Sequence, residues 1–492
     1  MDLNTRMDEL YALKEPRENS YLRFERSACS SHPSISDVVE GYGRVATSRT
    51  LPSLSTLILD TDTGYKPVTH IRTTLTLQTM DYTGNLQTTG GDPVEATVTY
   101  EKTVDIMCDV TDNDNGTYTI SFTPLKVGKH LVQASIFGRD VGTGTLVEVC
   151  GSHNPHKVYG SKGTGHENLS QPAAIVISYR SSSSPEDEKP MSKESLLFNP
   201  NNKKGLVYVA DTGNSRIKVL DENLNFKYHL TGDTFNGRSV TGICVTENNT
   251  IMVVNWRTQT VSELTQDGQI IRQFTHNFLQ EPTSITVSDG GMAVVADGFK
   301  VHVFDYSASH SRSQSQSNSL PNSPTKSPMK AMSSVPTGKL LYSWGAKGNK
   351  DGEVGPITAL CWVPPTGDSS DSEGEIVIAD SRLQVFSVRG TYIRSIRNKP
   401  SGSKSSSGSS GKVSSGSYGG VTLDGNRLLL ASRQDKGSAC VQIFDYSLAT
   451  LIFTIDSTES RLKRPAGLAT TTDGWLLVLD IGGCCVKRFR YR

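Results

Sequence analysis

The chain has 492 residues, a length that corresponds to about three ordinary domains or to fewer, larger β units. Its hydrophobic share of 35% is below that of a typical globular chain, which predicts long polar segments that build no core. Lys plus Arg and Asp plus Glu both number 50, which excludes attachment to nucleic acid or lipid by bulk charge. Any basic binding site must therefore be local.

The sequence offers no membrane span and no secretory leader. No stretch approaches about 18 uninterrupted apolar residues, and the start lacks an apolar run after a basic cap. The eight cysteines show neither CxxC pairs nor Cys/His spacing, which speaks against zinc modules and a disulfide framework. We therefore expect a cytoplasmic protein without cofactor or metal.

The first part of the chain, residues 1–56, contains one short helical pattern that is broken at Pro16. The rest of this part is polar and has little periodicity. We expect it to be a largely irregular linker or the tail of a helix.

From residue 57 to 152 the texture changes to short β-rich runs separated by turn residues every eight to twelve positions. The runs are IRTTLTLQTM (71–80), VEATVTY (94–100), VDIMCDV (104–110), TYTISFTP (117–124) and HLVQASIF (130–137). This spacing is typical of an immunoglobulin-like β-sandwich.

Residues 153–492 contain an apolar strand motif that recurs in six copies, each followed by a second strand. The copies are LVYVAD (206–211), IMVVNW (251–256), MAVVAD (292–297), EIVIAD (375–380), LLLASR (428–433) and LLVLDI (476–481). In the first three copies the motif positions 211, 255 and 297 lie 44 and 42 residues apart, the length of one four-stranded propeller blade.

Longer intervals between later copies coincide with Ser-, Gly- and Pro-rich tracts, which predict disordered inserts rather than extra blades. These inserts lie near residues 180–203, 307–338, 366–375 and 400–417. The chain stops after the third strand of the sixth copy, which would leave a bare sheet edge. We expect residues 156–160 to pair there and to close the ring.

The first copy, from Val209 to Leu220, reads VADTGNSRIKVL and resembles the NHL repeat, whose consensus is VxDxxNxRIxVF. Later copies keep the strands but change the loop, as where Asn255 replaces the aspartate. The preceding sandwich resembles a filamin-type immunoglobulin repeat through DNGTYTISFTP (114–124), GKH (128–130) and FG (137–138). The resemblance implies an all-β protein with a filamin-like immunoglobulin β-sandwich followed by a six-bladed NHL β-propeller.

This domain order is similar to that of the TRIM-NHL family, in which a RING, B-boxes and a coiled coil come first. The family resemblance implies ubiquitin-ligase activity and dimerisation through those first modules, and selection of protein or RNA targets by the propeller. No residues of this chain match a RING or a B-box, so ligase chemistry would require a RING from a partner or a longer isoform. Residues 1–13 would at most be a remnant of the coiled coil.

Charge is unevenly distributed along the chain. Residues 1–152 hold 13 basic and 20 acidic residues, and residues 153–492 hold 37 and 30. In a propeller, one face is built by the connections entering the blades and those between second and third strands. Assigning each charge to a face gives about +5 on this face and about −5 on the other, with motif residues Asp211, Asp297, Asp380 and Asp480 expected to bond local backbone.

A basic face with interleaved aromatic residues suits single-stranded RNA, because cations contact phosphates and exposed rings stack bases. Aromatic candidates beside the cations include Phe278 and Trp344. The residues expected to bind RNA or a protein partner are Arg216, Arg238, Trp256, Arg257, Lys347, Lys350, Arg382, Tyr418, Arg433, Arg461, Lys463 and Arg464. The alternative for each Arg is that it ties neighbouring blades together.

No nucleophile motif, phosphate-binding loop or HExxH occurs, and the histidines do not recur at one blade position, so we expect a protein that is not an enzyme. The first hypothesis is RNA binding for post-transcriptional regulation. The second is a substrate-binding adaptor in ubiquitination, working with a RING-containing partner. The sandwich could also bind an extended peptide along an edge strand.

Overall fold

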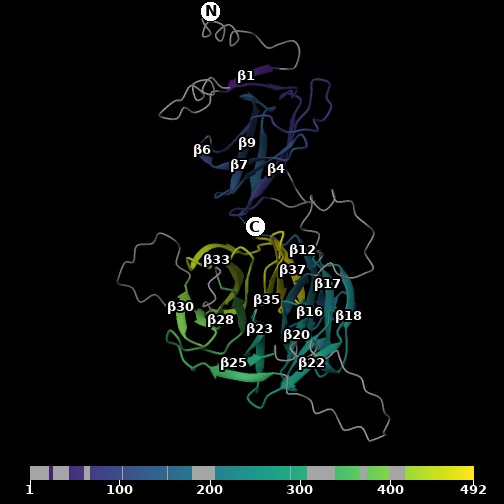
Figure 1. Ribbon diagram of the computed structural model, residues 1–492, viewed down its shortest axis with the longest axis vertical. Helices are drawn as coiled ribbons and strands as arrows, with labels where there is room; N and C mark the ends of the chain where they lie inside the picture. The colour runs from purple at the N-terminus through teal and green to yellow at the C-terminus, as the bar shows by residue number, and fades with distance from the viewer. Residues whose placement is uncertain are drawn as a thin grey trace, which may run out of the picture. The chain divides into compact units, whose positions relative to one another are not determined.

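The computed structural model describes residues 21–25, 44–59, 67–101, 103–151, 153–179, 205–288, 290–306, 338–365, 374–397 and 416–492 (Figure 1). The chain forms two compact units, Met1–Gly151 and Ser152–Arg492. The helical pattern expected before Pro16 lies outside the described residues. So do the four expected inserts, apart from a few residues at their C-terminal ends. Within the described ranges, no helix has the length and apolar character needed to cross a membrane.

The segment expected to be a largely irregular linker contains an antiparallel strand pair. β1 (Tyr21–Glu25) pairs with β2 (Arg44–Ser48) along their full length. Thr50 then forms an isolated bridge with Asp81, and its hydroxyl donates to Asp92 at 2.5 Å. Described residues before position 57 therefore contribute both a strand pair and contacts to the sandwich.

The first unit contains two antiparallel sheets whose inward side chains form one core. The first sheet has the order β3 (Thr56–Leu59), β4 (Thr73–Gln78), β8 (Thr117–Phe122), β7 (Cys108–Asp112). The second has the order β10 (Arg139–Asp140), β9 (Gly128–Ile136), β5 (Val94–Tyr100), β6 (Thr103–Ile106), with β11 (Thr145–Val149) also paired to β9. Leu75, Leu77, Ile120 and Val132 are fully buried between them.

The alternation of buried and half-buried residues along β4 is the period of two that a half-buried strand requires. One expected strand is divided in the structure. The run 104–110 contributes β6 to one sheet and β7 to the other, and Met107 at the crossing is 94% exposed. The sequence pattern conceals this crossing because Ile106, Cys108 and Val110, at alternate positions on both sides of it, pack against the same core.

The second unit is a ring of six four-stranded antiparallel sheets, the predicted blades. Blade 1 consists of β15 (Ile175–Tyr179), β16 (Gly205–Asp211), β17 (Arg216–Asp221) and β18 (Phe226–Leu230). Blade 2 consists of β19 (Val240–Val245), β20 (Ile251–Asn255), β21 (Thr260–Leu264) and β22 (Ile270–Thr275). Blade 3 consists of β23 (Pro282–Val287), β24 (Met292–Asp297), β25 (Lys300–Asp305) and β26 (Lys339–Trp344).

The remaining blades follow the same plan. Blade 4 consists of β27 (Ala359–Val363), β28 (Glu375–Ala379), β29 (Leu383–Ser387) and β30 (Tyr392–Ile396). Blade 5 consists of β31 (Ser417–Leu423), β32 (Leu428–Asp435), β33 (Ser438–Asp445) and β34 (Thr450–Ile455). Blade 6 consists of β35 (Pro465–Thr470), β36 (Trp475–Asp480), β37 (Cys485–Arg490) and β12 (Lys157–Tyr159).

Blade 6 joins the two ends of the propeller sequence, as the sequence predicted. β12 pairs antiparallel with β37, with Lys157 opposite Arg488 and Tyr159 opposite Val486 (Figure 1). The innermost strands of successive blades are in contact all the way round, including β35 of blade 6 with β15 of blade 1. The ring is therefore closed.

Hydroxyl groups link several neighbouring blades on one face of the ring. The Thr241 hydroxyl donates to the Pro282 carbonyl at 2.7 Å, and the Thr283 hydroxyl donates to the Ile357 carbonyl at 3.0 Å. The Thr358 hydroxyl donates to the Tyr418 carbonyl at 2.8 Å. These bonds fix the inner strands side by side, so the loops above them start from a rigid frame.

Candidate functional site

The loop face of the propeller comprises the connections that enter each blade and the turns between second and third strands. Two short elements lie in the connection to blade 1, the paired strands β13 (Ser161–Lys162) and β14 (Asn168–Leu169). Two 3-10 turns, η2 (Thr212–Asn214) and η3 (Asp233–Phe235), also belong to this face. All the residues that the sequence proposed for binding lie in or beside these connections.

A buried carboxylate at the end of the second strand anchors the entering connection in four blades. Asp211 accepts from the Ser170 amide at 2.7 Å, and Asp380 accepts from the Gly355 amide at 2.7 Å. Asp297 accepts two amides, from Gln280 and Glu281, at 2.6 and 2.8 Å. The expectation that these motif carboxylates bond local backbone is confirmed, so they do not present negative charge to a ligand.

Asp480 of blade 6 makes the same contact to a basic segment. Its two oxygens accept from the Lys463 and Arg464 amides at 3.0 and 2.8 Å. Asn255 takes the position in blade 2, where its oxygen accepts from the Arg257 amide at 3.0 Å and its amide donates to the Thr234 carbonyl at 3.0 Å. The Asp-to-Asn change therefore keeps the anchor without a charge.

Cations at the third strand form ion pairs with these aspartates or donate hydrogen bonds to backbone carbonyls of the entering connection. In blade 1, Arg216 forms an ion pair with Asp211 at 2.8 Å and donates to the Gly165 carbonyl at 2.9 Å. Lys218, which is fully buried, donates to the carbonyls of His166 and Asn168. Burial, together with the smaller effect of the neighbouring Arg216 charge, lowers the Lys218 pKa to about 8.

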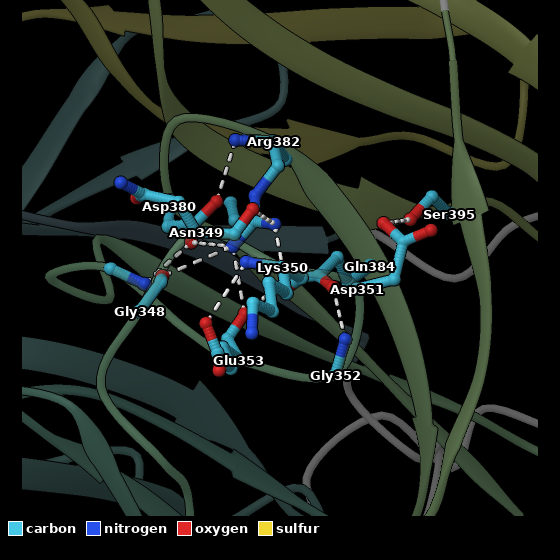
Figure 2. Close-up of polar contacts among 12 residues, drawn as sticks. Gly348, Asn349, Lys350, Asp351, Gly352, Glu353, Asp380, Arg382, Gln384 and Ser395 are labelled. Carbon is cyan, nitrogen blue, oxygen red and sulfur yellow. Dashed lines mark hydrogen bonds and ion pairs between the residues drawn. The ribbon is translucent and has the colours of Figure 1, made fainter.

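In blade 4, Arg382 has the same role as Arg216 in blade 1, because it bonds both the motif aspartate and the entering connection (Figure 2). Its guanidinium donates to the carbonyls of Asn349 and Lys350 at 2.7 and 2.9 Å, and to the Glu353 carbonyl at 2.7 Å. Its ion pair with Asp380 spans 3.4 Å. A planar fork with several donors suits this array of carbonyls, and it leaves little of the guanidinium for a ligand.

Three further candidates are engaged inside the propeller. Tyr418 is only 3% exposed and donates to Gln442 at 3.0 Å. Arg433 lies over the Tyr418 ring and binds both oxygens of Asp435 at 3.0 Å. Trp344 donates to the Val388 carbonyl at 3.1 Å and packs on Phe386. We leave these residues, with Arg216 and Arg382, out of the binding surface because packing and internal bonds occupy them.

Exposed candidates cluster first at blade 2. Trp256 is 39% exposed, and the Arg257 guanidinium lies 5.4 Å from the centre of its ring. Arg238 is exposed in the connection that enters this blade and has a left-handed backbone, with φ of 56°. Two cations and an indole thus share one part of the loop face.

A second group continues from blade 3 into the connection to blade 4. Phe278 is 55% exposed and stacks on His276 with ring centres 5.0 Å apart. The Lys347 ammonium lies 4.5 Å from the centre of the Phe299 ring, and Lys350 is exposed on the same connection. Phe299 was not singled out from the sequence, because nothing in its local pattern distinguishes a half-exposed ring from a packed one.

A third group lies at blade 6, in the connection between β34 and β35. The side chains of Arg461, Lys463 and Arg464 are exposed. Their backbone is fixed, because Lys487 donates to the Arg461 carbonyl at 2.7 Å while Asp480 accepts from the amides of Lys463 and Arg464. The connection therefore presents three cations from a fixed backbone.

Over the described part of the loop face, exposed cations outnumber exposed carboxylates. The exposed cations are Lys162, Arg238, Arg257, Lys300, Lys347, Lys350, Arg397, Lys436, Arg461, Lys463 and Arg464. The exposed carboxylates are Glu167, Asp233, Glu281, Asp351, Asp456 and Glu459. Among the described residues there is no cluster of three or more His, Cys, Asp or Glu side chains arranged to hold a metal.

Two sequence comparisons with known proteins match part of this chain. Residues 61–144 match the filamin/ABP280 repeat. A segment of 152 residues is 24% identical to the E3 ubiquitin-protein ligase TRIM71 of Rattus norvegicus, and equally to that of Mus musculus. The match covers 30% of this chain and 15% of each relative, so this chain spans well under two thirds of those proteins.

Solved structures with low identity were also found. The Lin-41 filamin domain has a TM-score of 0.19 at 21% identity, covering 21% of this chain and 98% of that one. A protein of unknown function from Bacteroides thetaiotaomicron has a TM-score of 0.42 at 13% identity, covering 88% of this chain and 98% of that one. Streptogramin B lyase has a TM-score of 0.36 at 12% identity, covering 60% of this chain and 81% of that one.

The sheet order and the family match define an all-β protein with a filamin repeat followed by a six-bladed propeller. The resemblance to the TRIM-NHL family is confirmed by the filamin repeat at residues 61–144 and by the distant similarity to TRIM71 over part of the chain.

Proposed function

We propose that this chain is a cytoplasmic, non-catalytic recognition protein whose loop face binds single-stranded or looped RNA in post-transcriptional regulation. The observation that carries the proposal is that acidic motif side chains of that face are buried, whereas many of its basic side chains are exposed. Asp211, Asp297, Asp380 and Asp480 are turned inward to backbone amides, whereas Arg257, Lys350 and Arg464 extend into solvent. Inward carboxylates oppose phosphate groups less than exposed ones do.

Aromatic groups support single strands over duplexes as the ligand. Trp256 is exposed beside Arg257, and Phe278 is exposed on the same face. An unpaired base can stack on such a ring while its phosphate contacts a cation of the face. A duplex keeps its bases stacked on one another and offers only backbone and groove edges to these rings.

Salt dependence tests this proposal. We expect the full chain to bind a random single-stranded RNA pool with micromolar or tighter affinity. If about five phosphates are neutralised, raising the salt from about 50 to about 200 mM should weaken binding about 100-fold. Fluorescence anisotropy with labelled RNA measures both quantities. Absence of binding at the lower salt concentration contradicts RNA recognition.

A second candidate is supported by the similarity to TRIM71, whose name describes a ubiquitin-protein ligase. In this version the propeller holds a protein substrate for a RING-containing partner, and the chain acts as an adaptor. Loss of RNA binding together with saturable, RNase-resistant binding of a defined protein would favour this candidate.

The filamin repeat could also take up an extended peptide along a free sheet edge. β6 already pairs with the part of β5 from Val98 to Tyr100, so that stretch of edge is occupied. β3 and β7 are the edges of the other sheet. A peptide ligand of this unit therefore stays a prediction for those edges.

A further inference from the structure

Two arginines of neighbouring blades meet on one tyrosine at the turn face of the propeller, which carries the connections between first and second and between third and fourth strands. Arg394 lies in β30 of blade 4, and Arg427 lies in the β31–β32 connection of blade 5. The guanidinium carbons of Arg394 and Arg427 lie 4.6 and 5.2 Å from the ring centre of Tyr446, which is 1% exposed. One buried ring therefore holds two positive charges close together.

Backbone carbonyls fix both side chains but use few of their donors. Arg394 donates from Nη2 to the Tyr446 carbonyl at 2.9 Å, and Arg427 donates from Nη1 to the Pro364 carbonyl at 3.2 Å. A guanidinium has five N–H donors. The Nε atoms of both arginines have no hydrogen-bond partner in the part of the chain that the structure describes. Most donors of the pair are therefore not engaged by described residues.

A similar arrangement at blade 2 is neutralised by a carboxylate. Arg272, at the corresponding position of β22, lies 5.2 Å from the ring centre of Tyr306 and donates to its carbonyl. Glu263, directly opposite on β21, forms an ion pair with Arg272. In blade 4 the residue opposite Arg394 is Val385. The second arrangement therefore receives no counter-charge from its own blade.

Carboxylates that adjoin the arginine pair are bonded to other groups. They are Glu375, Asp424 and Asp445, which accept from a tyrosine hydroxyl or from backbone amides. Within the described ranges, none of them forms an ion pair with Arg394 or Arg427. Two adjacent cations repel each other, and a bound anion removes this repulsion.

The backbone at Arg427 is left-handed, with φ of 60°. The corresponding residues are Asn249 in blade 2, Gly291 in blade 3 and Gly474 in blade 6, with φ of 57°, 77° and 90°. Glycine and asparagine adopt this conformation readily, whereas an arginine carries backbone strain there. Such strain is often retained at functional positions. Blade 5 thus has an arginine where the fold favours glycine or asparagine.

We propose that Arg394 and Arg427 bind a phosphate group, carried by a phosphoserine or phosphothreonine of a partner protein. A guanidinium presents paired donors that match the oxygens of a phosphate, and stacking on a ring fixes the direction of these donors. The site lies on the face opposite the loop face, so the proposal does not rest on RNA binding.

The surroundings of the pair favour a peptide over RNA as the carrier of the phosphate. Ile393, next to Arg394, is 42% exposed, and Leu448, in the β33–β34 connection, is 71% exposed. These aliphatic side chains suit apolar residues beside a phosphorylated side chain. The Tyr446 ring is buried and cannot stack on a base, which a single-stranded RNA would require.

A comparison of peptide libraries tests the site in the wild-type chain. A library with one fixed phosphoserine between random positions and the same library with serine are passed together over the immobilised full chain and read by mass spectrometry. We expect at least about tenfold enrichment of phosphorylated peptides, because charge-assisted hydrogen bonds form only with the phosphate. Inorganic phosphate should release them at millimolar concentration. Equal recovery of both libraries, or recovery of neither, overturns the proposal.

Substitution of the two arginines locates the site. Arg427→Gly introduces the residue of blades 3 and 6, and Arg394→Met keeps an unbranched side chain over Tyr446. Each should reduce the enrichment at least about tenfold and leave a cooperative melt. Lys339→Met removes an exposed charge at the corresponding end of β26 and is the control, with unchanged enrichment expected. Full enrichment in both arginine variants would contradict the site. Should either variant fail to fold, the wild-type libraries still decide.

A final comparison separates this site from RNA recognition. Arg257→Glu with Arg464→Glu changes only the loop face and should leave the phosphopeptide enrichment unchanged, whatever its effect on RNA. Release of bound phosphopeptides from the wild type by single-stranded RNA, but not from the loop-face variant, would place the peptides on the loop face and overturn the proposal. Release from both would assign the arginine pair to a nucleic-acid phosphate and contradict a protein partner.

Discussion

At the scale of single residues, Arg382 and Arg257 carry the same charge on the same face but have different surroundings. Arg382 donates to several backbone carbonyls of one connection, whereas Arg257 is exposed beside Trp256. The sequence predicted that both lie on this face. It could not separate them, because the carbonyls that engage Arg382 come from a connection about 30 residues earlier.

Arg382→Ala should destabilise the propeller by about 2 to 4 kcal/mol, because it removes the cation paired with the buried Asp380 and leaves several backbone carbonyls without their side-chain donor. Thermal melting measures the loss, and faster exchange of residues 346–355 should accompany it. Arg238→Ala, at an exposed position of the same face, is the control and should melt like the wild type. An unchanged melting temperature of the Arg382→Ala variant would contradict this stabilising role of Arg382.

Lys218 gives a pH dependence with a definite sign. Its folded pKa of about 8 is below the ordinary 10.5, so between these pH values the unfolded chain binds more protons than the folded chain. The contribution of Lys218 to stability should therefore rise as the pH rises from about 8 to about 10.5. The free energy of unfolding of the wild type minus that of Lys218→Met should therefore increase when it is measured at rising pH across this range. A constant difference would contradict the burial of the charge.

At the scale of elements, the apolar runs of the sequence predicted the strands, and the missing fourth strand of the sixth blade predicted how the ring closes. β12 was predictable because the sixth blade lacked a partner and residues 156–160 stood where a fourth strand falls. The division of residues 104–110 between two sheets and the pairing of β1 with β2 were not predictable. Both depend on which partner a strand meets, and local periodicity carries no information on that.

Outer strands share a feature that the sequence pattern did not reveal. A register shift recurs in the fourth strands of blades 1 to 5, and in blades 2 to 5 it leaves Ile271, Leu341, Ile393 and Ile452 unpaired and exposed. A bulge at an edge strand disfavours pairing with another chain, which offsets the exposed aliphatic side chain.

Deleting residues 486–492 removes nearly all of β37 and the partner of β12, so the ring should lose its cooperative melt. A deletion of equal length within the insert 400–417, residues 404–410, controls for chain shortening and should leave the melting transition unchanged. Differential scanning calorimetry distinguishes the two. A cooperative, unshifted transition after the C-terminal deletion would mean that closure does not depend on this strand.

At the scale of the whole molecule, the account depends on the two faces of the propeller having different surface charge. On the loop face, the second strands of four blades deliver a carboxylate to backbone amides, while the connections above them carry the cations. The sequence predicted the sign of the loop face. It overestimated the number of available cations, since Arg216, Arg382 and Arg433 are bound internally.

The most direct measurement compares RNA affinity after charge reversal on the loop face and elsewhere on the propeller. Arg257→Glu with Arg464→Glu should weaken RNA binding at least about tenfold, reduce the salt slope by about 1.4 and leave the melting temperature unchanged. Lys227→Glu with Lys339→Glu, on outer strands, makes the same change in net charge and should leave the affinity unchanged. Equal loss of affinity in both pairs, or no loss in either, would contradict RNA recognition by the loop face.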